Sequence, residues 1–376
     1  MQKIQMVDLK KQYSEIKPEI DQAIQEVIDS CAFVRGPKVF EFEANLAKYL
    51  NVKHVVSCAN GTDALQVAVM ALGLEPGDEV IVPSFTYAAT AEIIALLRLK
   101  PIMVDVTLDT FEIDISDLET QVTSKTKAII PVHLFGQCTN MDAVMTFADK
   151  HSLFVIEDNA QAIGADYNGT QHKGKSGTIG HIGCTSFFPS KNLGCYGDGG
   201  AICTNDVKLE ESIRQICNHG EKIKYHHDII GCNSRLDGIQ GAVLDIKLPL
   251  LDAYNANRYK SAQVYNSLLR NMDMIITPVE ATYSTHVYHQ YTLRITNGKR
   301  DELAEYLKEN EIPFGIYYPI PLYKQKAYSS YVKEEFKLKN TELLCNEVIS
   351  LPMHSHLDIE TQEIICSHII SFFNGE

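Results

Sequence analysis

The fold is decided by a stretch in the middle of the chain, Leu153-Phe154-Val155-Ile156-Glu157-Asp158-Asn159-Ala160-Gln161. Its apolar first half predicts a short buried strand over Leu153–Glu157, and the polar residues that follow predict a strand end. Three similar apolar runs precede it, separated by helical stretches, at Glu79–Val82, Pro101–Val106 and Lys127–His133. Strands that alternate with helices predict a mainly parallel sheet with helices on both faces.

Helices and a second unit are predicted on either side of this region. Residues 16–28 carry apolar side chains at helical spacing, Gly36-Pro37 begins another helix, and Asn60 can cap a helix over Gly61–Leu72. After residue 250 the pattern predicts a helix, a strand and a helix over Leu248–Leu269, Tyr288–Ile295 and Lys299–Glu309. We therefore predict an α/β protein with a large domain over residues 1–250, including the N-terminal helices, and a small C-terminal α/β domain over residues 251–376.

Composition narrows the class of protein. The chain has 376 residues, 45% of them hydrophobic, and a formal net charge of −14. This charge argues against binding to nucleic acid or to an anionic membrane surface. No apolar run approaches the roughly 18 residues of a membrane helix. The ten cysteines contain no Cys-x-x-Cys pair, so we expect reduced thiols and a cytoplasmic protein.

Lys191 is the first candidate for chemistry. It lies in an apolar loop flanked by small residues, Ser186-Phe187-Phe188-Pro189-Ser190-Lys191-Asn192-Leu193-Gly194. Burial or a neighbouring cation lowers the pKa of a lysine and makes it an imine-forming nucleophile. The alternative is an ordinary surface lysine on a turn.

Two further candidates lie at predicted strand ends, where ligands bind in such sheets. Asp158 can keep a pyridinium nitrogen protonated, although it can also cap the next helix. The segment Asn60-Gly61-Thr62 begins a helix whose free N–H groups can bind a phosphate, or it is a plain capped helix. Together with Lys191, in this order along the chain, the three indicate one site.

The motifs resemble the PLP-dependent nucleotide-sugar aminotransferases of the DegT/DnrJ/StrS type, and the resemblance covers nearly the whole chain. Its residues are Phe33-Val34-Arg35-Gly36-Pro37, Asn60-Gly61-Thr62-Asp63-Ala64-Leu65, Pro83-Ser84-Phe85-Thr86-Tyr87, Glu157-Asp158-Asn159-Ala160-Gln161, Ser186-Phe187-Phe188-Pro189-Ser190-Lys191, Gly197-Asp198-Gly199-Gly200-Ala201, Asn233-Ser234-Arg235-Leu236 and Tyr318-Pro319-Ile320-Pro321-Leu322. It implies the aspartate aminotransferase fold (fold type I) and pyridoxal 5'-phosphate as cofactor.

The resemblance also implies residue roles. Lys191 would bind the cofactor covalently and shuttle a proton, and Asp158 would pair with the pyridine nitrogen. The other implied cofactor contacts are Gln161 at the ring hydroxyl, Gly61, Thr62 and Ser186 at the phosphate, Tyr87 stacked on the ring with Phe85 as a competing choice, and Asn233 reaching the phosphate of the partner subunit's cofactor. A homodimer with shared active sites follows. Relatives that replace the lysine with His run a dehydration, so Lys191 favours a transaminase.

The implied substrate is a nucleotide-linked sugar. Residues 183–200, Tyr288-His289-Gln290-Tyr291 and the Tyr318 motif are similar to the WbpE subgroup, which aminates the 3-keto group of a UDP-N-acetyl-hexosaminuronate with glutamate as donor. Arg235 would then bind the substrate's anionic groups, with a structural ion pair as the alternative. Tyr317 and Tyr318 would contact the substrate from this loop, with Tyr317 in place of the His that many relatives have. A dTDP-4-keto-6-deoxy or 3-keto-6-deoxy sugar, or a non-catalytic PLP-binding regulatory protein, remain as alternatives.

Three other features carry less chemistry. His226-His227 and His354-Ser355-His356 lack an organised set of further ligands, so we expect solvated or interface histidines rather than a metal site. Gly197-Asp198-Gly199-Gly200 is predicted to form a tight turn before a strand over Ala201–Thr204.

Overall fold

The structure, a computed structural model, describes residues 4–116, 118–333 and 335–375. Its helices are α1 (Leu9–Glu15), α2 (Lys17–Ser30), α3 (Pro37–Leu50), α4 (Gly61–Ala71), α5 (Ala89–Leu96), α6 (Met141–His151), α7 (Val207–Cys217), α8 (Gly238–Lys247), α9 (Leu251–Leu269), α10 (Arg300–Glu309), α11 (Lys339–Glu347) and α12 (Ile359–Asn374). Its strands are β1 (His54–Cys58), β2 (Glu79–Pro83), β3 (Lys100–Val104), β4 (Thr126–Ile129), β5 (Phe154–Asp158), β6 (Asp166–Asn168), β7 (Lys173–Lys175), β8 (Ile182–Ser186), β9 (Gly200–Thr204), β10 (Glu221–Ile223), β11 (His226–His227), β12 (Ile275–Ile276), β13 (Tyr291–Ile295) and β14 (Val348–Leu351).

The main sheet, within the described residues, has seven strands in the order β1-β9-β8-β5-β4-β2-β3. Within the run β8-β5-β4-β2-β3, each strand is parallel to the next. Because β9 is antiparallel to both β8 and β1, the strand β1 runs in the same direction as β8. Six strands therefore end at one edge of the sheet, and the polar residues that follow them meet there.

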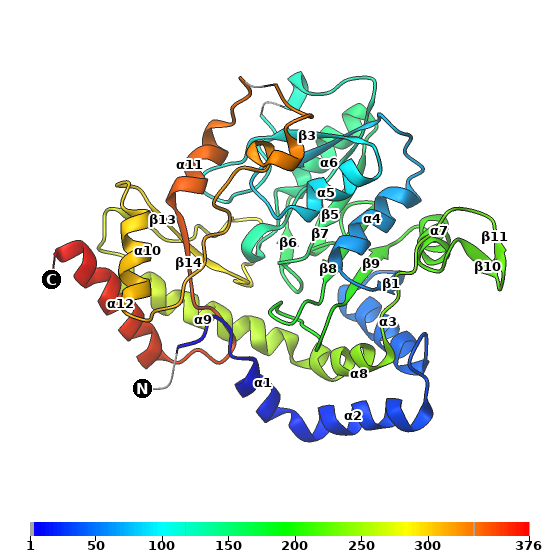
Figure 1. Ribbon diagram of the computed structural model, residues 1–376, viewed down its shortest axis with the longest axis horizontal. Helices are drawn as coiled ribbons and strands as arrows, with labels where there is room; N and C mark the ends of the chain where they lie inside the picture. The colour runs from blue at the N-terminus through cyan, green and yellow to red at the C-terminus, as the bar shows by residue number, and fades with distance from the viewer. Residues whose placement is uncertain (1–3, 117, 334, 376) are drawn as a thin grey trace.

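Helices cover both faces of this sheet, as the alternation predicted (Figure 1). Successive residues of a strand point to opposite faces: Ile156 packs with α4, α5 and α7, whereas Val155 packs with α6. On that second face, α3 and α8 cover the β1–β9 end of the sheet. Every strand of the central region is buried on both faces, which explains why it reads as a continuous apolar run.

A second, three-stranded antiparallel sheet, β12-β13-β14, lies at the other end of the long helix α9 (Figure 1). It shares one apolar cluster with α9, α10 and α12, including Tyr265, Leu293 and Ile365. The N-terminal segment also reaches this unit, because Met353 N donates to Met6 O. We propose a domain boundary near residue 250, although this contact joins the N-terminal segment to the small domain.

Several predicted boundaries shift for local reasons. The strand predicted over Lys127–His133 ends at Ile129, shortly before Pro131, which has no N–H to donate to a ladder. The strand predicted from Tyr288 begins at Tyr291, because Tyr288 has a left-handed backbone with φ 45°. The turn predicted at residues 197–200 does lead into β9.

Candidate active site

The site lies at the common edge where the parallel strands end. Asp158 is the last residue of β5 and pairs with Cys184 of the neighbouring strand β8. Ser186 ends β8 and faces Gly200 of β9, which in turn faces Cys58 at the end of β1. The sheet therefore brings together three segments far apart in sequence: the end of β5, the β8–β9 loop with Lys191, and the β1–α4 turn.

The loop that carries Lys191 is held from three sides. Phe187 and Leu193 are fully buried in the core between α3 and α8. Asn192 Nδ2 donates to Asn255 Oδ1 on α9 at 2.7 Å and to Val287 O at 2.9 Å. Lys247 Nζ, from the end of α8, donates to Gly194 O at 2.5 Å. The packing of Phe187 before Lys191 and the hydrogen bonds of Asn192 and Gly194 after it hold the loop in place.

Lys191 and Asp158 interact through their charges. Burial lowers the pKa of Lys191 to about 8, against the opposing effect of the Asp158 carboxylate. Burial raises the pKa of Asp158, and hydrogen bonds and the charges of Lys191 and His133 oppose it. No ion pair involving the Asp158 side chain is present within the described part of the chain. The carboxylate is therefore buried, 6% exposed, without a cation bonded to it.

The start of α4 faces Ser186. Asn60 caps the helix by accepting a hydrogen bond from Asp63 N at 2.8 Å. This leaves the N–H groups of Gly61 and Thr62 for another acceptor, since the first residues of a helix lack intrahelical partners. A Cβ placed on Gly61 would lie 2.6 Å from the Ser186 Cβ. Only glycine allows this close approach, so the free N–H groups and the Ser186 hydroxyl share one small space.

Aromatic residues form one wall near Gln161. Gln161 Oε1 accepts from Phe135 N at 2.8 Å, and Gln161 Nε2 donates to the Tyr318 hydroxyl at 3.3 Å. The ring of Tyr318 lies 6.3 Å from that of Tyr87, which is 61% exposed. Phe85 is 1% exposed and packs among Phe111 and Phe135. Tyr87 thus has a free face, and Phe85 belongs to the core.

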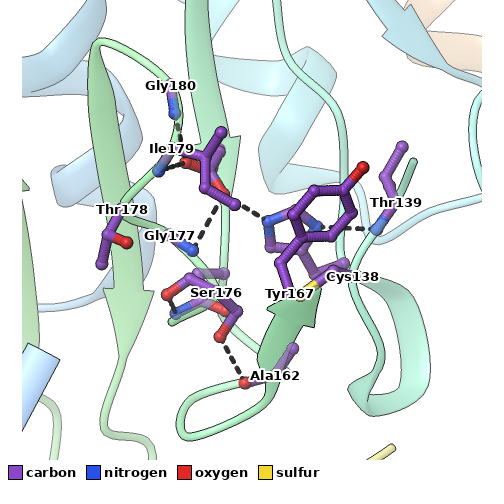
Figure 2. A network of polar contacts seen from close by, with 12 residues as sticks. Cys138, Thr139, Ala162, Tyr167, Ser176, Gly177, Thr178, Ile179 and Gly180 are labelled. Carbon is purple, nitrogen blue, oxygen red and sulfur yellow. Dashed lines mark hydrogen bonds and ion pairs between the residues drawn. The ribbon is translucent and has the colours of Figure 1, made fainter. Parts of the chain in front are cut away.

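A buried polar network surrounds Glu157, the residue before Asp158, and Figure 2 shows Thr139, Gly177, Ile179 and Gly180 as parts of it. The Glu157 carboxylate accepts from Gly177 N, Ile179 N and Gly180 N at 2.6–2.9 Å, and from His133 Nε2 at 2.7 Å. His133 Nδ1 accepts from Thr139 N, so the proton of a neutral imidazole is on Nε2. His133 N also donates to Asp158 O at 3.0 Å. This network ties the 133–139 and 176–180 segments to the strand that presents Asp158.

The structure places Asn233 and Arg235 away from Lys191, and Tyr317 next to Tyr318. Asn233 is exposed, and Arg235 lines a cavity of about 750 Å³ with Arg35, Arg214 and Lys224 rather than with Lys191. Arg235 Nη1 donates to Asn218 Oδ1 at 3.4 Å. Tyr317 is partly buried in an apolar cluster with Phe85 and Phe135. Within one chain, Asn233 and Arg235 are therefore not brought into the Lys191 group.

Two residues of this neighbourhood, Thr90 and Lys247, were not found from the sequence, whereas His133 is the polar end of the strand predicted over Lys127–His133. Thr90 Oγ1 donates to Asp158 Oδ2 at 2.8 Å. The one available signal for Lys247 was its position among apolar residues, Val243, Leu244, Ile246 and Leu248. Thr90 gave none, because its partner Asp158 is 68 residues away.

Other features are quickly placed. His226 and His227 are exposed on the β10–β11 hairpin, and His356 pairs with Glu15. Among the residues with described positions, no three His, Cys, Asp or Glu side chains are grouped to hold a metal ion. None of the described helices is long and apolar enough to cross a membrane.

Comparison with known proteins gives consistent matches over the full length. A model described as the DegT/DnrJ/EryC1/StrS aminotransferase family matches residues 14–370. A Pseudomonas aeruginosa protein named UDP-2-acetamido-2-deoxy-3-oxo-D-glucuronate aminotransferase is 47% identical over 97% of this chain and 99% of its own. A Geobacillus stearothermophilus protein named pleiotropic regulatory protein is 46% identical over 98% of both chains.

A solved structure extends the match to the fold. The crystal structure of S. venezuelae DesV in complex with a ketimine intermediate superimposes with a TM-score of 0.94 and is 38% identical, covering 99% of both chains. The family and the fold predicted from the motifs are confirmed by these matches.

Proposed function

The chain belongs to the DegT/DnrJ/EryC1/StrS aminotransferase family, and on that premise we propose that it transfers an amino group from glutamate to the keto group of UDP-2-acetamido-2-deoxy-3-oxo-glucuronate. The product would serve the synthesis of a bacterial surface polysaccharide. The observation that carries the proposal is the charge interaction of Lys191 with buried Asp158 at the carboxyl edge of the sheet. The name of the 47% identical P. aeruginosa relative supports this choice of sugar.

The site residues fit pyridoxal 5'-phosphate. A buried carboxylate without a bonded cation, Asp158, matches the need of a protonated ring nitrogen for a counter-charge. The free N–H groups of Gly61 and Thr62, with the Ser186 hydroxyl beside them, match the acceptor oxygens of a phosphate. When bound, the cofactor supplies an electron sink for the carbanion formed at the substrate carbon.

Lys191 is proposed as the covalent attachment point and the proton carrier. Burial lowers the pKa of Lys191 to about 8, so its amine loses its proton more readily than that of an exposed lysine. A neutral Nζ can act as a nucleophile and can take a proton from the carbon that carries the amino group. The bonds from Asn192 and Lys247 hold the loop, which limits the conformations available to Lys191 before the reaction.

Asp158, Gln161 and Tyr87 would orient the ring. Asp158 keeps the ring nitrogen protonated, and Gln161, fixed by Phe135 N, offers its amide to a ring hydroxyl. Tyr87 presents an exposed ring face for stacking. Tyr318 and Tyr317 would line the entry from the other side, where the phenol of Tyr318 already contacts Gln161.

We also propose a homodimer with shared sites. Ser234 is fully buried, and its Oγ accepts from Ala59 N, two residues before Gly61. On either side of Ser234, Asn233 is exposed and Arg235 lines the cavity with Arg35 and Arg214, which Lys191 does not line. The adjacent hairpin β10–β11 projects beyond α7 (Figure 1), and Ile223 and Tyr225 in it and Ile230 shortly after it are exposed. A second subunit would cover these apolar residues and receive Asn233 and Arg235.

The alternative function is that of a non-catalytic, PLP-binding regulatory protein. The name of the 46% identical G. stearothermophilus relative keeps this alternative in view. However, the loss of Lys191 or Asp158 would favour a non-catalytic protein, and both residues are present. The proposal therefore remains a transaminase.

Single-turnover spectroscopy tests the function. Purified protein with PLP is mixed with glutamate and then with a panel of UDP- and dTDP-linked keto sugars. We expect a cofactor absorbance that glutamate converts and that the UDP-linked 3-keto uronate restores. Borohydride reduction and peptide mapping should locate the pyridoxyl group on Lys191. A label on another lysine would refute the site, and preference for a dTDP-linked 6-deoxy sugar would refute the substrate while leaving the aminotransferase assignment.

A further inference from the structure

We propose that Thr90 is a positioning residue of this transaminase, whose hydroxyl keeps the Asp158 carboxylate ionised and fixed in orientation. The inference rests on the proposed function and adds a residue that none of the sequence motifs identified. It predicts that the protonation of the cofactor's ring nitrogen depends on a hydroxyl that does not touch the cofactor.

The Thr90 hydroxyl donates its hydrogen bond to Asp158. Thr90 is the second residue of α5 and is 0% exposed, and its Oγ1 lies 2.8 Å from Asp158 Oδ2. The other carboxylate oxygen, Oδ1, accepts from Ala160 N at a longer 3.2 Å. In the described part of the chain, Thr90 is the one side chain that hydrogen-bonds to this carboxylate. Thr86 Oγ1, at 3.4 Å from Thr90 Oγ1, can donate to the oxygen of Thr90 in turn.

The groups around Asp158 explain why this donor matters. Lys191 from the β8–β9 loop and His133 from the β4 side favour the charged carboxylate. Three other ionisable groups near Asp158 supply no positive charge that would favour its charged form. They are Cys184 of β8, Tyr318 and the neighbouring Glu157. Burial raises the pKa of Asp158, and the Thr90 hydrogen bond is the largest effect that lowers it. Without the hydroxyl, the proton of a ring nitrogen–carboxylate pair moves toward Asp158.

Packing holds the hydroxyl in place in advance. Ala91, Ile93 and Ile94 of α5 are fully buried against the sheet. The first turn of α5 therefore cannot rotate away from β5 without opening the core. A donor fixed in this way stabilises charge without reorganising during the reaction.

The test removes the hydroxyl in two ways and restores it in a third. Thr90→Val keeps the shape, Thr90→Ala makes the side chain smaller, and Thr90→Ser keeps the donor. Thr292→Val is the matched control, because Thr292 is a 2% exposed threonine whose hydroxyl lies 2.8 Å from that of Ser350 in the other sheet. Each protein is loaded with PLP labelled with ¹⁵N in the ring. The ring ¹⁵N resonance is followed across the neutral pH range beside kcat, KM and thermal unfolding.

We expect wild type, Thr90→Ser and Thr292→Val to show the resonance of a protonated ring. In Thr90→Val and Thr90→Ala, the ring ¹⁵N resonance should change to that of an unprotonated ring at a lower pH than in wild type. Their kcat should be lower by on the order of tenfold, with KM for glutamate little changed. A purely structural role would lower the unfolding temperature and leave the resonance in place. The inference is overturned if either hydroxyl-free variant keeps the wild-type resonance and turnover. A wild type that binds no PLP at Lys191 would instead overturn the proposed function.

Discussion

The Gly61→Ala substitution tests the start of α4 as the phosphate site. The new Cβ would lie 2.6 Å from Ser186 Cβ, 3.1 Å from Ser186 Oγ and 3.3 Å from Ser186 Cα. Real Cβ atoms do not approach this closely, and Ser186 Cα belongs to the backbone at the end of β8. Either α4 or β8 must move, and both carry groups that would bind the phosphate.

Two effects of opposite sign decide the size of the change. Forcing a methyl group into a packed site costs about 1–3 kcal/mol. Replacing glycine by alanine at a position that alanine tolerates gains about 0.4–1 kcal/mol through the unfolded chain, and the φ of Gly61 lies outside the left-handed region. The steric cost therefore dominates. If all of it fell on cofactor binding, affinity for PLP would drop by about 5- to 150-fold.

The assay is a PLP titration of the apoprotein, followed by absorbance, together with thermal unfolding. Gly174→Ala is the control, because its Cβ would meet only the Thr178 side-chain oxygen, at 2.9 Å. We expect Gly61→Ala to bind PLP more weakly and the control to bind as wild type does. Wild-type affinity in Gly61→Ala would refute the assignment of this turn to the phosphate.

Three further predictions concern single charges. Asp158→Asn should still bind PLP but turn over on the order of 10²-fold more slowly, because an amide cannot keep the ring nitrogen protonated; near wild-type kcat would reduce Asp158 to a structural residue. Mixing inactive Lys191→Ala and Arg235→Ala subunits should restore part of the activity, since one site of each heterodimer would be intact, whereas no recovery after verified subunit exchange would argue for sites within one chain. Lys247 is buried, and burial lowers its pKa from 10.5 to about 8. Between these two pH values the unfolded state binds more protons than the folded state, so the contribution of Lys247 to the free energy of unfolding rises with pH. Denaturant unfolding of wild type and Lys247→Met should show this difference in slope, and parallel pH profiles would contradict it.

The sequence carried most of the fold and the chemical centre of the site. An apolar run that ends in polar residues is a local pattern, so β2 to β5 and their ends were predictable to within a few residues. Lys191 and Asp158 were found because each stands next to an apolar run where a charge is unexpected. The left-handed backbone of Tyr288 and the end of the regular strand β4 at Ile129 were not predictable, because periodicity does not report backbone angles.

What the tertiary structure decided is which of these ends meet and what supports them. Thr90 and Asp158 are 68 residues apart, Lys247 and Gly194 are 53 apart, and Tyr318 and Gln161 are 157 apart. The sequence alone determined that strands end in polar residues and which faces of the helices are apolar. The order of strands in the sheet, with β9 inserted antiparallel between β1 and β8, is set by long-range packing of those faces. The partners of Asp158 and Lys191 follow from that order, since a hydrogen bond needs two groups within about 3 Å and no local pattern encodes that distance.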